Sequence, residues 1–106
     1  MNTDIDQAIK NANAKARAVA ALLLYACQDR QVRQTDADEM QDASVQLVGG
    51  RGHVQVFIGT VARPLIVWRH LPNGAQRCCG EWATAGQAVA MLLEVEACDE
   101  DGRRLG

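Results

Sequence analysis

The chain has 106 residues, of which 48% are hydrophobic and 23% charged, and its formal net charge is −2. This length and composition are those of one globular domain and exclude a highly charged, disordered chain. The longest apolar run, Ala18 to Ala26, is shorter than the ~20 residues of a membrane-spanning helix, so we expect no membrane contact.

The N-terminal segment and the cysteines indicate the compartment. The segment opens with Asp4 and Asp6 and stays polar as far as Lys15, whereas a secretory signal has a basic start and an apolar stretch. We therefore expect a cytoplasmic protein with free thiols. The four cysteines are Cys27, Cys78, Cys79 and Cys98. Their only close pair is vicinal, a spacing that does not suit zinc, so we expect no metal and no cofactor.

Residues 1–30 are predicted to form a long helix. Apolar and alanine side chains recur at alternating steps of four and three residues, as one face of a helix requires. These positions are Ile5, Ile9, Ala12, Ala16, Val19, Leu23 and Ala26. The alanines suit either close packing on the chain's own sheet or a seam with a second copy, so we also consider a homodimer through this helix.

Residues 31–43 are polar and acidic and are predicted to connect the helix to a sheet that covers residues 44–82. Within the sheet, Val45 and Leu47 alternate with polar residues, as do Val54, Val56 and Ile58 after the sequence Gly49-Gly50-Arg51-Gly52. This pattern predicts a hairpin with a glycine-rich turn. A phosphate-binding loop would need a lysine and a following helix, and the sequence predicts a strand there instead.

A second hairpin follows. Pro64 precedes the β-branched and aromatic run Leu65 to Trp68, and Pro72-Asn73-Gly74 is a turn sequence before Gln76 to Trp82. A two-residue Asn-Gly loop and a three-residue Pro-Asn-Gly loop differ by one position in register. They would therefore place opposite sets of side chains on the inner face, and both remain open.

Residues 84–98 are predicted to form a second helix, and residues 99–106 a polar tail. Thr84 and Gln87 have the spacing of a capping box at the start of this helix. The sequence thus predicts a single α+β domain over residues 1–106, in the order α-β-β-β-β-α. We expect a three- to four-stranded antiparallel sheet with both helices packed on one face.

Charge is divided between regions of the chain. No acidic residue lies between Ser44 and Gly80, whereas acidic residues cluster in 29–42 and 94–101. We therefore predict a basic outer sheet face that binds an anionic partner. Its candidate binding residues are Arg51, Arg69, Arg77, Trp68 and His70. The alternative interpretation is an ordinary solvated sheet face, and the acidic segments are a second candidate contact surface.

Catalysis by histidine or cysteine is a weaker hypothesis. No motif places a carboxylate or nucleophile beside His53 or His70, the two histidines of the chain. Cys78 and Cys79 are adjacent on a predicted strand, so one should face inward and the other outward. A reactive thiol would need a lowered pKa, and Arg77 is its obvious positive neighbour in sequence. We expect no catalytic residues.

Two resemblances bear on function. The order of elements is similar to that of the double-stranded RNA-binding domain, but that family has a lysine cluster where this chain has Thr84 to Ala88, and Lys10 and Lys15 are its only lysines. No binding residue is therefore carried over. In build, a small α+β domain without catalytic groups, the chain also resembles phage and mobile-element antagonists such as anti-CRISPR proteins, which implies an inhibitor that acts by binding.

These observations predict a non-enzymatic interaction protein that binds a larger macromolecule through a charged surface. A protein is the expected partner. One alternative is a nucleic-acid-binding module that uses the basic sheet face, whose binding would weaken steeply with salt. The other is a small cysteine- or histidine-dependent enzyme, whose activity would be lost on alkylation or on replacement of His70.

Overall fold

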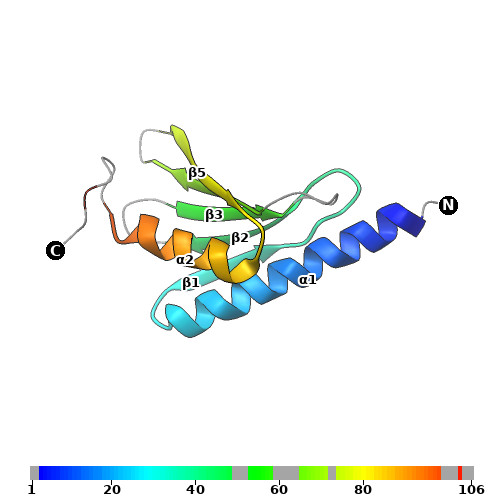
Figure 1. Ribbon diagram of the computed structural model, residues 1–106, viewed down its shortest axis with the longest axis horizontal. Coiled ribbons are helices and arrows are strands. Elements are labelled where there is room, and N and C mark those ends of the chain that lie inside the picture. Colours follow the sequence, from blue (N-terminus) through cyan, green and yellow to red (C-terminus); the bar gives the residue numbers. More distant parts are fainter. Residues whose placement is uncertain (1–2, 49–52, 59–64, 72–73, 99–102, 104–106) are drawn as a thin grey trace.

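A computed structural model of the chain describes residues 3–48, 53–58, 65–71, 74–98 and 103. The described residues form two helices and five strands (Figure 1). In chain order these are α1 (Thr3–Ala26), β1 (Gln31–Thr35), β2 (Ala43–Val48), β3 (His53–Ile58), β4 (Leu65–His70), β5 (Gln76–Trp82) and α2 (Ala85–Glu96).

The strands form one antiparallel sheet in which each pairs with the next in sequence, in the order β1-β2-β3-β4-β5. The predicted α+β class and antiparallel sheet are confirmed, and the sheet has five strands, one more than the largest number predicted. The additional strand is β1, which lies within the predicted connector 31–43. Its residues are polar and mostly exposed because β1 is an edge strand, so it lacks the apolar alternation by which strands are recognised.

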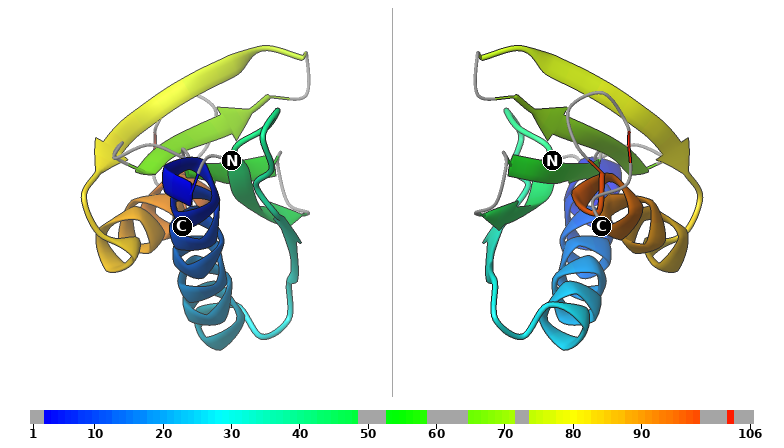
Figure 2. Two further views of the ribbon diagram at one scale, coloured as in Figure 1. Left: turned by 90° about the vertical axis from the view of Figure 1, so that its right-hand side faces the viewer. Right: turned by 90° about the vertical axis from the view of Figure 1, so that its left-hand side faces the viewer.

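Both helices lie on the same face of the sheet, as predicted (Figures 1 and 2). Helix α1 contacts β1, β2 and β3, whereas α2 contacts β3, β4 and β5, and the two helices contact each other. Together they form one layer over the sheet. In the part of the chain that the structure describes, no helix lies on the opposite face of the sheet, which we call the outer sheet face.

The core lies between the two layers. Its largest fully buried side chains come from every part of this sandwich: Val19, Leu23, Val45, Leu47, Ile58, Leu65, Val67 and Leu92. Ala12 and Ala16 are buried on the same side of α1. Small residues there allow the helix to approach the sheet closely. This confirms the middle of the predicted helix face.

The ends of α1 differ from the prediction. The helix ends at Ala26 rather than at residue 30, and a turn follows in which the Arg30 amide donates to the Cys27 carbonyl at 3.1 Å. No Gly or Pro marks this end in the sequence. At its other end α1 projects past the sheet, so Ile5, predicted on the buried face, is exposed (Figure 1).

The second hairpin has the register of the three-residue alternative. The Leu71 amide donates to the Ala75 carbonyl at 2.8 Å, and His70 pairs with Gln76. Residues 72–73 lie outside the described residues. Gly74 has a φ of 87°, a conformation that glycine adopts without strain. The Gly49-Gly50-Arg51-Gly52 turn of the first hairpin lies outside the described residues.

Strand β5 contains a β-bulge. Val67 pairs with Gly80 and Trp68 with Cys78, so Cys79 is the extra residue. Gly80, which follows the bulge, has a φ of 140°. A short loop then leads to α2, where Thr84 and Gln87 form the predicted capping box. Helix α2 ends at Glu96, two residues before the predicted end.

Candidate interaction surfaces

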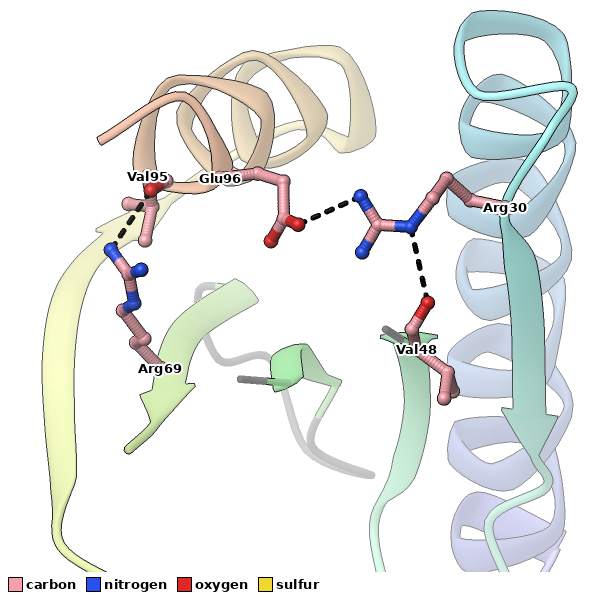
Figure 3. Close-up of polar contacts among 5 residues, drawn as sticks. All are labelled: Arg30, Val48, Arg69, Val95 and Glu96. Carbon is pink, nitrogen blue, oxygen red and sulfur yellow. Dashed lines mark hydrogen bonds and ion pairs between the residues drawn. The ribbon is translucent and has the colours of Figure 1, made fainter. Parts of the chain in front are cut away.

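Arg69 does not lie on the outer sheet face, and this part of the predicted basic surface is wrong. Side chains alternate along β4, so Arg69 is on the same side as the buried Leu65 and Val67, and only 4% of its surface is exposed. Its Nη1 donates to the Val95 carbonyl at 3.0 Å (Figure 3). The guanidinium group therefore lies between the sheet and the C-terminal end of α2.

The position of Arg69 suits the electrostatics of α2. The carbonyls of a helix's last turn carry a partial negative charge that a cation stabilises. Helix α2 has no basic residue in its own last turn. Arg69 supplies that charge from β4, and so ties the helix to the sheet.

We expect Arg69→Met to lower the free energy of unfolding by about 2 kcal/mol, because it leaves the Val95 carbonyl without this donor and removes the charge. Arg77→Met is the matched control, since Arg77 is the Cα partner of Arg69 but is exposed. It should change stability by less than about 0.5 kcal/mol. Urea unfolding measures both. Equal losses would contradict this role of Arg69.

The other predicted binding residues do not form one surface. Arg77 is exposed on the edge strand β5, whereas Trp68 and His70 are half-buried and alternate with Arg69 on β4, which places them on the outer sheet face. Arg51 lies outside the described residues. His70 and His53 are Cα partners on β4 and β3.

A second arginine, which the sequence gave no reason to single out, joins three elements. Arg30 Nη1 lies 2.7 Å from Glu96 Oε1 of α2, and Arg30 Nε donates to the Val48 carbonyl of β2 at 3.1 Å (Figure 3). Arg30 itself comes from the turn after α1. Through these two contacts Arg30 links the C-terminal ends of α1 and α2 to β2. Its positive charge is paired with a carboxylate of the same molecule.

The cysteines are free thiols in different surroundings. Cys78 is exposed, whereas Cys79 packs against the core, as expected for adjacent residues of a strand. Burial raises the pKa of the Cys79 thiol, Cys78 raises it further, and Arg69 and Arg77 act in the opposite direction. Burial also raises the pKa of Cys27. Both shifts are opposite to those that favour a nucleophilic thiolate.

We expect iodoacetamide at pH 8 to alkylate Cys78 before Cys27 and Cys79. Cys78 is exposed, while a raised pKa leaves Cys27 and Cys79 with less thiolate than an ordinary thiol at this pH. Peptide mass spectrometry over time measures the order. In urea the three rates should converge. Alkylation of Cys79 first in the folded protein would contradict the assignment.

Across the described residues, His, Cys, Asp and Glu side chains do not gather in groups of three that could hold a metal ion. The described helices also include none with the length and apolar character to cross a membrane.

The acidic segment between β1 and β2 is hydrogen-bonded within itself and to α1. Asp38 Oδ1 accepts hydrogen bonds from the Met40 and Gln41 amides, and Asn13 Oδ1 of α1 accepts one from the amide of the buried Ala37. Met40 is 93% exposed. This loop therefore presents an exposed apolar side chain among carboxylates at the flank of α1.

Four of the five large hydrophobic residues that are exposed in the described chain lie on α1. On the side of the helix away from the core, Tyr25 is 82% and Leu22 42% exposed. Ala14, Ala18 and Ala21 are exposed on the same side, at steps of three and four residues. We call these five residues the α1 stripe. Figure 2 shows that neither the sheet nor α2 covers this side of α1.

Comparison with protein-family models, curated proteins and solved structures finds no match to this chain. The α1 stripe was missed as a contact surface, although Leu22, Leu24 and Tyr25 lie outside the predicted buried face. The sequence did contain one indication of this surface: apolar residues lie on all sides of the C-terminal half of the helix.

Proposed function

We propose that this protein acts by binding another protein and that the α1 stripe is its contact surface. The observation that carries the proposal is the exposure of Leu22 and Tyr25 on a helix whose opposite side already packs in the core. A helix that is apolar on both sides has more apolar surface than its own fold covers. Exposed apolar patches of this kind are typical of protein interaction sites.

The charged sheet face has less support as the contact surface. Of the three arginines expected there, Arg69 is buried against α2 and Arg77 is exposed. The third, Arg51, lies outside the described residues. Arg77 is the Cα partner of Arg69 and therefore lies on the helix side of β5, whereas Trp68 and His70 lie on the outer sheet face. A basic groove needs several cations within reach of one ligand, and these three described residues do not share one face.

An inhibitor of the kind that phages and mobile elements make is one form of such a protein-binding role. We place it in the cytoplasm, where the four free cysteines would stay reduced. The acidic loop that presents Met40 flanks the same helix and would extend the contact toward a partner with basic groups around an apolar surface.

The test is capture from a host extract with three immobilised proteins: the native chain, Tyr25→Glu on α1, and Arg77→Glu on β5. Both substituted residues are exposed, so both variants should fold. We expect proteins retained by the native chain to be lost with Tyr25→Glu and kept with Arg77→Glu, with little dependence on salt. Mass spectrometry identifies and quantifies them.

Treatment of the extract with nuclease separates the alternatives. Loss of the captured material with Arg77→Glu, with nuclease and with rising salt, but not with Tyr25→Glu, would contradict the proposal and support nucleic-acid binding through the sheet.

A further inference from the structure

We draw no further inference here: the strongest candidate, the backbone edge of strand β1 (Gln31–Thr35) that faces away from β2, has the geometry to pair with an added strand, but nothing in the structure shows what covers it.

Discussion

Replacing Leu23 with alanine should lower the free energy of unfolding by about 2–5 kcal/mol, the usual cost of a leucine deleted from a packed core. Leu23 is 0% exposed and belongs to the core cluster between α1 and the sheet. The loss has two parts: fewer buried methyl groups, and a cavity that the surrounding β-strands cannot fill. For a domain of this size, each kcal/mol corresponds to roughly 4–8 °C in melting temperature.

Leu22→Ala is the matched control, because it removes the same atoms one position earlier in the same helix. Leu22 is 42% exposed, so the variant should lose less than about 1 kcal/mol. Urea unfolding measures both variants, and the slope with urea should stay unchanged. Comparable losses would mean that α1 buries a different side from the one described.

Replacing Gly80 with alanine should cost roughly 3 kcal/mol. Gly80 has a φ of 140°, which side chains with a Cβ rarely adopt, and such strain costs about 1–3 kcal/mol. An added Cβ would also lie 3.1 Å from Cζ2 of Trp82, whose ring packs against the core. Relieving that contact would displace the Trp82 ring and lower the free energy of unfolding further.

The matched control is Gly86→Ala. In the same urea-unfolding measurement we expect it to change the free energy of unfolding in the opposite direction. Gly86 lies in the first turn of α2, and a Cβ there meets no atom within 4 Å. Alanine should therefore stabilise the protein by about 0.5 kcal/mol through helix propensity. If Gly80→Ala were as harmless as Gly86→Ala, the bulged geometry of β5 would be wrong.

Elements with apolar periodicity or a capping sequence were predictable from the sequence. Helix α2 begins at its Thr84–Gln87 capping box, and the strands from β2 to β5 follow their apolar runs and turn sequences. Strand β1 was not predictable in the same way. In Gln31–Thr35 the single apolar residue is Val32, and pairing with β2, rather than burial, makes this segment a strand.

The candidate site was harder to predict, because burial depends on register. With the hairpin loop undecided between two and three residues, Arg69 and Trp68 could exchange faces, and the charge of Arg69 argued for exposure. The structure buries Arg69 because its long side chain reaches the carbonyls that end α2. For α1, the apolar pattern predicted which side faces the sheet. It did not predict that the other apolar residues of the helix are exposed.

The projection of α1 past the sheet implies a gradient of local stability along this helix. From Asp4 to Asn11 no residue is buried, whereas Val19 and Leu23 are held by both layers. Amide protons in the first turns should exchange with solvent through fraying that costs little free energy. Those around Val19 to Leu23 should exchange only when the whole domain opens.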